Sequence, residues 1–140
     1  MNLKNFMVLA LSLSVVIGAT LTGGCLRNET TTIEDITPQE VFALIQNNQK
    51  NPDFVIIDVR TPQEFTGERI ENATNIDFYS ETFRDMLNNL DKNKTYLIYC
   101  RSGARSGSTL DIMADLDFKD VNNISGGMIA WDAAGLPTVK

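Results

Sequence analysis

The sequence contains no histidine and only two cysteines, Cys25 and Cys100, among its 140 residues. Without histidine the chain cannot build Ser-His-Asp or Cys-His catalytic groups or histidine metal sites, and we predict no metal or other cofactor. Basic residues are also scarce, because twelve Lys and Arg stand against eighteen Asp and Glu, giving a formal net charge of −6. This acidic balance argues against nucleic-acid binding.

The one long apolar run lies at the N-terminus. Lys4 precedes the apolar residues 6–17, and small residues then follow up to Gly24. This pattern predicts a secretory signal peptide over residues 1–24, with an uncleaved anchor as the alternative, although the run is short for a membrane span. The stretch ends Leu-Thr-Gly-Gly-Cys, which looks like a bacterial lipoprotein cleavage box, so Cys25 is the candidate lipidation site. An ordinary cleavage site is the alternative. We therefore expect an extracytoplasmic protein, either anchored to the cell membrane by lipid or periplasmic or secreted.

The rest of the chain divides into a short linker and one domain. Residues 25–32 are polar and rich in threonine, which predicts a tether, and residues 33–140 are long enough for one hydrophobic core. Lipidation of Cys25 would leave Cys100 as a free thiol. The alternative outside the cytoplasm is a Cys25–Cys100 disulfide, which would block that thiol.

Apolar runs alternate with helical patterns along the domain. Strands are predicted over residues 54–58, 70–76, 96–99 and 121–124. Helices are predicted after the capping boxes at Thr37 and Thr61 and over residues 78–90, 110–116 and 128–134. Because the strands at residues 54–58 and 96–99 are short and largely apolar, the alternation predicts an α/β domain with a parallel sheet of about five strands and helices on both faces.

The most informative stretch joins the strand at residues 96–99 to a helix. Its loop consists of Cys100, Arg101, Ser102, Gly103, Ala104 and Arg105, and Ser106 follows in the first helical turn. Gly103 and Gly107 permit sharp turns and close approach. A cysteine between a strand end and a helix N-terminus lies where free N–H groups converge, which favours a thiolate. We therefore predict that Cys100 is a reactive, partly exposed thiolate. A buried core cysteine is the alternative.

Two charged residues follow the strand at residues 54–58. Asp58 and Arg60 lie where α/β folds collect functional groups, so both are candidates for a supporting role beside the site. The favoured structural interpretation is a surface ion pair between Arg60 and Glu64.

Apolar side chains farther along the chain are predicted to fill the core. Within residues 78–90 a core-facing stripe is expected from Phe83, Met86, Leu87 and Leu90, which recur at helical spacing. Trp131 is predicted to be a core residue rather than a ligand contact.

Three stretches resemble, in order, the signature motifs of the rhodanese-like sulfurtransferases. Residues 58–76 are similar to the first signature, the loop C-R-S-G-A-R followed by Ser106 resembles the active-site loop, and residues 126–137 resemble the closing signature. Glu68 stands where that family usually has His, which we expect to alter a surface hydrogen bond rather than the chemistry.

The resemblance implies a sulfurtransferase that carries sulfane sulfur as a persulfide on Cys100. Cys100 would attack the outer sulfur of thiosulfate or a similar donor, and cyanide, a thiol or a protein acceptor would then remove the sulfur. The backbone of residues 101–106 would form the anion cradle. Arg101 would steer the anionic donor, and Arg105 would either do the same or brace the loop against a carboxylate.

Two alternatives stay open at this point. Cys-dependent phosphatases and arsenate reductases use a C-x5-R loop, whereas Arg105 makes a tighter C-x4-R loop, which suits one sulfur atom better than a phosphate. The other alternative is a membrane-tethered sulfur carrier or binding module, in which Cys100 accepts a persulfide from a partner with little free turnover.

Overall fold

The computed structural model describes residues 30–140, so the predicted signal peptide, Cys25 and most of the predicted tether lie outside the described residues. Five strands form one parallel sheet in the order β1-β5-β4-β2-β3. They are β1 (Thr32–Ile36), β2 (Phe54–Asp58), β3 (Thr74–Asn75), β4 (Thr95–Tyr99) and β5 (Asp120–Ile124). The helices are α1 (Pro38–Asn48), α2 (Pro62–Gly67), α3 (Phe83–Asn88), α4 (Ala104–Asp115) and α5 (Gly127–Ala133). Across residues 30–140, no helix combines the length and apolarity needed to cross a membrane.

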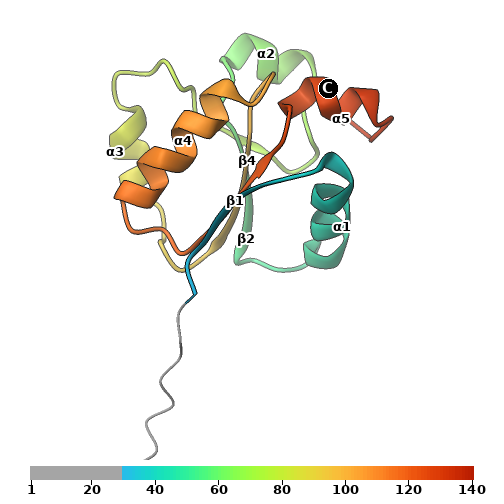
Figure 1. The fold of residues 1–140 in the computed structure, drawn as a ribbon. Helices are drawn as coiled ribbons and strands as arrows, with labels where there is room; N and C mark the ends of the chain where they lie inside the picture. The colour runs from blue at the N-terminus through green and yellow to red at the C-terminus, as the bar shows by residue number, and fades with distance from the viewer. Residues whose placement is uncertain (1–29) are drawn as a thin grey trace, which may run out of the picture.

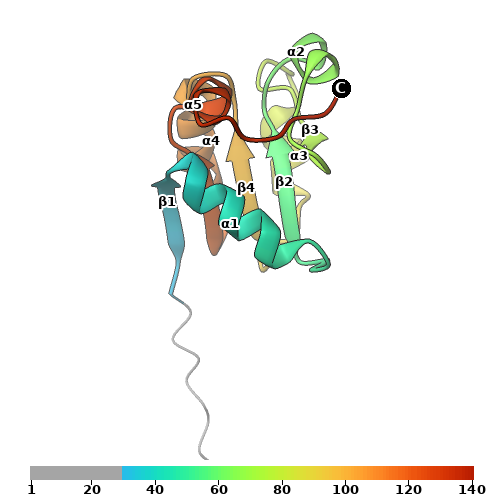
Figure 2. The ribbon, with the colours of Figure 1, turned by 90° about the vertical axis from the view of Figure 1, so that its right-hand side faces the viewer.

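Helices cover both faces of the sheet, as predicted. Helices α1 and α5 lie over one face, and α3 and α4 lie over the other (Figures 1 and 2). Each face has its own core, one built around Val41, Met128 and Trp131 and the other around Leu87 and Met113. The predicted α/β architecture is therefore confirmed.

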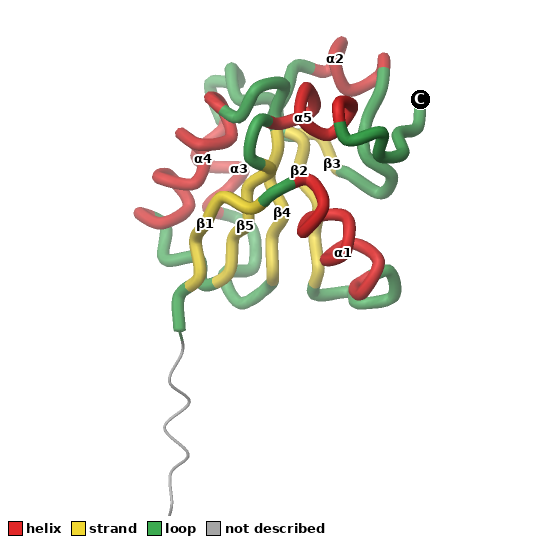
Figure 3. Tube along the Cα trace, turned by 45° about the vertical axis from the view of Figure 1, so that its right-hand side comes forward, coloured by secondary structure: helices red, strands yellow, loops and turns green. Residues whose placement is uncertain are grey.

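The parallel arrangement brings the carboxyl ends of all the strands to one edge of the sheet (Figure 3). The central strand β4 is the most deeply buried, because residues 96–99 are at most 1% exposed. Cys100 follows β4 directly at this edge. β1 begins at the opposite edge, where Thr32 pairs with Asp120.

Two predicted capping boxes set the starts of α1 and α2. At α1 the Glu40 carboxylate accepts from the Thr37 N–H at 2.8 Å, and the Glu40 N–H donates to the Thr37 hydroxyl at 3.3 Å. Thr61 and Glu64 repeat the same exchange at α2. Each box satisfies N–H groups that a helix start leaves free.

Two predictions about helices are wrong in part. The helix expected over residues 78–90 is confined to α3, and Met86 within it is 38% exposed, so it is not part of the core stripe. Phe83 and Leu87 are buried as predicted. Met86 is left outside the core because a helix of six residues can turn only a narrow side toward the sheet. Trp131 is confirmed as a core residue at 1% exposure.

Candidate active site

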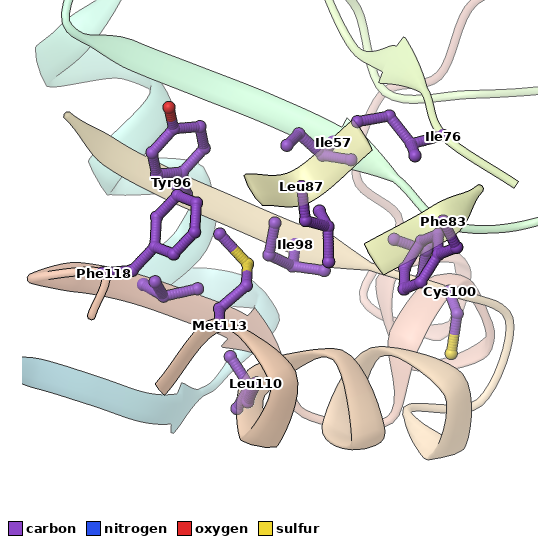
Figure 4. Packing of buried hydrophobic residues seen from close by; sticks show 12 residues of the cluster. Ile57, Ile76, Phe83, Leu87, Tyr96, Ile98, Cys100, Leu110, Met113 and Phe118 are labelled. Atoms are coloured by element: carbon purple, nitrogen blue, oxygen red, sulfur yellow. The ribbon is translucent and has the colours of Figure 1, made fainter. Parts of the chain in front are cut away.

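Cys100 lies at the floor of the loop and is only 1% exposed, so the prediction of a partly exposed cysteine is wrong. Figure 4 shows it at the end of the cluster on the α3 and α4 face, with its sulfur turned toward the start of α4. The burial has a local cause, because the loop folds over the thiol. Ser106, whose hydroxyl contacts the sulfur, is itself fully buried.

Two donors point at the sulfur. The Gly103 N–H donates to Cys100 Sγ at 3.1 Å, and the Ser106 hydroxyl donates at 3.2 Å. Burial alone would raise the pKa of the thiol, but the Ser106 hydroxyl and the backbone N–H groups of Ser106, Gly103 and Ser102 outweigh it and lower the pKa of Cys100. Although it is buried, Cys100 therefore lies in a setting that favours the thiolate.

The helix after the loop begins earlier than predicted. α4 starts at Ala104, because Gly103 takes a left-handed conformation with φ of 96° and reverses the chain in one residue. Ala104, Arg105 and Ser106 therefore belong to the first helical turn, and the Ser106 N–H, one of those that a helix start leaves free, points at the sulfur. Gly107 lies inside the helix and makes no turn.

The start of α5 holds the outer side of the same loop. The Met128 N–H donates to the Cys100 carbonyl at 2.9 Å, and the Ile129 N–H donates to the Arg101 carbonyl at 3.0 Å. Gly127 makes this approach possible, because a Cβ there would lie 2.5 Å from the Cys100 carbonyl oxygen and 2.7 Å from the Arg101 carbonyl. Because these bonds hold the Cys100 and Arg101 carbonyls on the outer side of the loop, the N–H groups of the following loop residues can turn toward the sulfur.

Arg105 braces the loop against a carboxylate, which was one of its two predicted roles. Its two terminal nitrogens donate to the two Glu64 carboxylate oxygens, each at 2.8 Å. This hydrogen bonding by Arg105 is the main reason that the pKa of Glu64 falls to about 2. The Arg105 guanidinium also lies 5.7 Å from the centre of the Tyr79 ring. Its charge is thus compensated before any substrate arrives.

The remaining loop residues line the outer surface. Arg101, Ser102 and Ala104 are all exposed. In the described part of the chain Arg101 forms no salt bridge, so its guanidinium is free to meet an anion at the loop.

Asp58 and Arg60 form a buried pair with each other, so the predicted surface pair of Arg60 with Glu64 is wrong. Arg60 Nη2 lies 2.7 Å from Asp58 Oδ2, and the two side chains are 7% and 0% exposed. The guanidinium also stacks 5.6 Å from the centre of the Tyr99 ring and donates to the Glu68 carbonyl. Since Tyr99 precedes Cys100, the pair supports the end of β4 and does not reach the sulfur itself.

A separate pocket of about 540 Å³ lies on the other face of the sheet. Its walls include Phe42 and Ile45 of α1, Phe54 of β2 and Trp131 of α5, and none of residues 100–106 lines it. Over residues 30–140, no cluster of acidic or cysteine side chains is suited to hold a metal ion. Among the described residues, Cys100 and its loop therefore form the candidate reactive site.

The sequence alone did not reveal three contacts of the loop. Glu64 lies 41 positions before Arg105, and its capping-box role explained its presence without the second bond. Tyr79 had no distinguishing pattern. The Gly126-Gly127 pair did signal a turn, but its contact with the Cys100 carbonyl depends on how β4 and β5 lie side by side.

Known proteins resemble this chain in sequence over most of the described domain. The rhodanese-like domain family matches residues 37–134. A sulfurtransferase of Allochromatium vinosum is 33% identical over 97 residues, covering 69% of this chain and 89% of its own. An uncharacterized protein of Synechocystis is 34% identical over 96 residues, and the match spans 69% of this chain but about half (52%) of that protein.

A solved structure has the same architecture. The rhodanese-related protein of Thermoplasma volcanium superimposes with a TM-score of 0.62 at 26% identity, covering 76% of this chain and 97% of that one. The family match extends from the capping box of α1 through the Cys100 loop to the end of α5. The chain belongs to the rhodanese-like domain family.

Proposed function

We propose that this protein is a sulfurtransferase that moves sulfane sulfur from thiosulfate or a similar donor to a thiol or cyanide through a persulfide on Cys100. The observation that carries the proposal is the pair of donors on the sulfur, the Gly103 N–H and the Ser106 hydroxyl. They favour a negatively charged sulfur at a position where no histidine can serve as a base.

The first step forms one bond and breaks another. The Cys100 thiolate attacks the outer sulfur of thiosulfate, the new S–S bond forms, and sulfite leaves with the electron pair of the old bond. Cys100 then carries a persulfide anion. In the second step a nucleophile takes the outer sulfur, and the Cys100 thiolate is the leaving group.

A lowered thiol pKa helps the second step more than the first. It raises the thiolate fraction at neutral pH, but it also lowers the nucleophilicity of that thiolate, so the two effects on attack partly cancel. A low-pKa thiol leaves faster, however, and this favours release of the sulfur. The loop therefore acts chiefly by holding the persulfide and by making Cys100 a good leaving group.

The state of Arg105 weighs against a phosphatase. An oxyanion of phosphate needs a guanidinium whose charge is directed at the thiolate side, whereas the Arg105 guanidinium donates from both terminal nitrogens to the Glu64 carboxylate, which compensates its charge. The compact loop and the compensated arginine both suit transfer of a single sulfur atom.

The test is carried out on the full chain, reduced and mixed with thiosulfate and cyanide. We expect thiocyanate to form, and with thiosulfate alone we expect the protein mass to increase by one sulfur atom. Cys100→Ser abolishes both signals, while Cys25→Ser, the matched cysteine control, retains both.

Three other outcomes are informative. Sulfur addition without turnover indicates the carrier alternative, in which a partner must supply or remove the sulfur. If neither thiosulfate nor an organic persulfide adds sulfur to Cys100, the proposal is wrong. Hydrolysis of an aryl phosphate that depends on Cys100 would point to the phosphatase instead.

We also propose that the protein is exported and anchored to the cell membrane through Cys25. The apolar residues 6–17 and the Leu-Thr-Gly-Gly-Cys stretch support this location. Mass spectrometry of the N-terminal peptide from membranes tests it, since a diacylated Cys25 is expected. An unmodified Cys25 on a cleaved chain contradicts lipidation but leaves export standing.

A further inference from the structure

The pocket beside α1 lies away from Cys100, on the face of the sheet that α1 and α5 cover. Its volume of about 540 Å³ falls within the range of roughly 300–1,000 Å³ that small-molecule sites occupy. It is bounded by α1, by β2 and by residues 70–72, together with Pro137 and Val139 of the segment after α5. We call this cavity the α1 pocket. The proposed sulfur transfer makes no use of it.

The wall that the C-terminal segment contributes is fixed by hydrogen bonds. Val139 forms an antiparallel bridge with Arg69, with N–H···O distances of 2.8 and 2.9 Å. The Pro137 carbonyl accepts from the Trp131 indole N–H at 3.1 Å. In Figure 2 this segment runs from α5 across the end of β2. Because its walls are held by bonds within the protein, the α1 pocket is formed before any ligand arrives.

The lining of the α1 pocket is in large part apolar and aromatic. It includes Phe42 and Ile45 of α1, Phe54 of β2 and Trp131 of α5. The Phe42 and Trp131 rings meet edge to face, with their centres 6.2 Å apart. Since the indole N–H is already bonded to Pro137, Trp131 offers the pocket its ring and no free donor. This lining favours a ring compound, whose apolar surface is removed from water when it packs there.

The charges at the α1 pocket favour a cation. Among the described residues that line it, Glu71 is the one with a charged side chain, and it forms no salt bridge with another described residue. The C-terminal end of α1 also lines the pocket, through Gln46, Asn48 and Gln49, and its last turn contains no basic residue. A helix C-terminus carries partial negative charge. Lys50, which follows, is exposed and lies outside the lining.

From the apolar lining and the negative charge we infer that the α1 pocket binds a small organic amine, a ring compound with one ammonium group. Its rings pack against Phe42 and Ile45, and its ammonium group lies toward Glu71 and the end of α1. An organic anion would meet the same carboxylate with no cation to balance it. The inference is independent of the sulfur chemistry, because none of residues 100–106 lines the pocket.

The test compares three probes of one shape and different charge. They are p-phenylbenzylamine, a cation, p-phenylbenzyl alcohol, which is neutral, and p-phenylbenzoate, an anion. Calorimetric titration of the full chain measures affinity, and the fluorescence of Trp131, the single tryptophan, reports entry into the pocket. We expect saturable binding of the amine at least about tenfold tighter than that of the carboxylate, with the alcohol between them. Cys100→Ser should bind all three probes as the unaltered protein does.

Three variants that each raise the net charge by one unit locate the effect. Gln46→Lys places an ammonium group at the pocket and should weaken amine binding about tenfold while it strengthens carboxylate binding. Glu71→Gln should weaken amine binding about threefold and leave alcohol binding unchanged. Gln63→Lys is the matched control, because it adds the same charge to an exposed position of α2 outside the pocket and should leave all three affinities unchanged.

Several results would overturn the inference. One is a carboxylate that binds as tightly as the amine, and another is the absence of any change in Trp131 fluorescence with the amine. If Gln63→Lys weakens amine binding as much as Gln46→Lys does, the attraction comes from the net charge of the protein and not from the pocket.

A second copy of the chain is the competing occupant. A dimer in sedimentation that Gln46→Lys dissociates would assign the α1 pocket to a protein interface and overturn the inference. The thiocyanate assay on Cys100 decides the proposed function separately, because the amine and the sulfur donor use different sites.

Discussion

At the scale of single residues, Ser106 is the side chain most closely tied to the state of the sulfur. Its hydroxyl is fully buried and donates to Cys100 at 3.2 Å. We predict that Ser106→Ala raises the pKa of Cys100 and slows sulfur loading near neutral pH about threefold, since the smaller thiolate fraction is partly offset by greater nucleophilicity. Alkylation by iodoacetamide across pH measures the change as a midpoint shifted upward.

Two further variants show whether the hydroxyl itself is responsible. Ser106→Thr restores a hydroxyl at the same position and should bring the midpoint back toward that of the unaltered protein. Ser108→Ala alters an exposed serine in the same helix and should leave the midpoint unchanged. An unshifted midpoint in Ser106→Ala would mean that the backbone N–H groups alone set the pKa of the thiol.

The Glu64–Arg105 pair predicts a stability effect that depends on pH. The folded-state pKa of Glu64 is about 2, below its ordinary 4.5, so its contribution is complete above pH 4.5 and is lost as the pH falls toward 2. Glu64→Gln should cost about 1 kcal/mol at pH 6, because the carboxylate is 27% exposed and partly screened. In urea unfolding we expect this cost to fall by more than half, to below about 0.5 kcal/mol, at pH 3. The same cost at both values of pH would contradict the charge pairing.

At the scale of elements, the start of α5 holds the loop through Gly127. We predict that Gly127→Ala destabilises the fold by at least about 2 kcal/mol, since its φ is +58° and the new Cβ would overlap the Cys100 and Arg101 carbonyls. Gly107→Ala is the matched variant, because a Cβ there meets nothing within 4 Å inside α4. It should stabilise the protein by about 0.5–1 kcal/mol. Thermal unfolding of both variants measures the contrast, and equal changes would contradict it.

The sequence reveals features that depend on neighbouring residues and does not reveal those that depend on distant contacts. The strands β2, β4 and β5, the capping boxes and the Cys100 loop were predictable because their signals lie in short stretches of neighbouring residues. β1 was not predicted, and the strand expected over residues 70–76 is confined to β3. The burial of Cys100, the exposure of Met86 and the partners of Arg60 and Arg105 depend on how distant segments pack. Asp58 lies two positions from Arg60 and Glu64 lies four, so spacing alone could not decide between them. The turn after β2 decides the partner, because it brings the Arg60 side chain back to the Asp58 carboxylate at the end of that strand.

At the scale of the whole molecule, the parallel sheet separates the loop from the start of the domain. Cys100 follows β4 at the carboxyl edge, and β1 begins at the opposite edge (Figure 2). The chain therefore enters the domain at the end of the sheet that lies opposite Cys100.

The buried Asp58–Arg60 pair ties several elements together at that carboxyl edge. Asn75 of β3 donates to the Asp58 and Arg60 carbonyls at 2.9 and 2.8 Å, and the Arg60 guanidinium stacks on Tyr99 of β4. Asp58→Ala would leave the Arg60 charge buried without its partner, so we predict a loss of about 3–5 kcal/mol in the free energy of unfolding. The intrinsic fluorescence of Trp131, the single tryptophan and a buried one, reports this unfolding in urea.

An exposed aspartate provides the comparison for this variant. Asp111→Ala removes the same charge from the surface of α4 and should change the free energy of unfolding by less than about 0.5 kcal/mol. The double change Asp58→Ala with Arg60→Met should recover much of the loss, because it removes the uncompensated charge while retaining an apolar side chain beside Tyr99. If the single Asp58 change costs no more than the Asp111 change, the pair does not hold the edge of the sheet together. The support of the Cys100 loop would then rest on α5 and on Glu64.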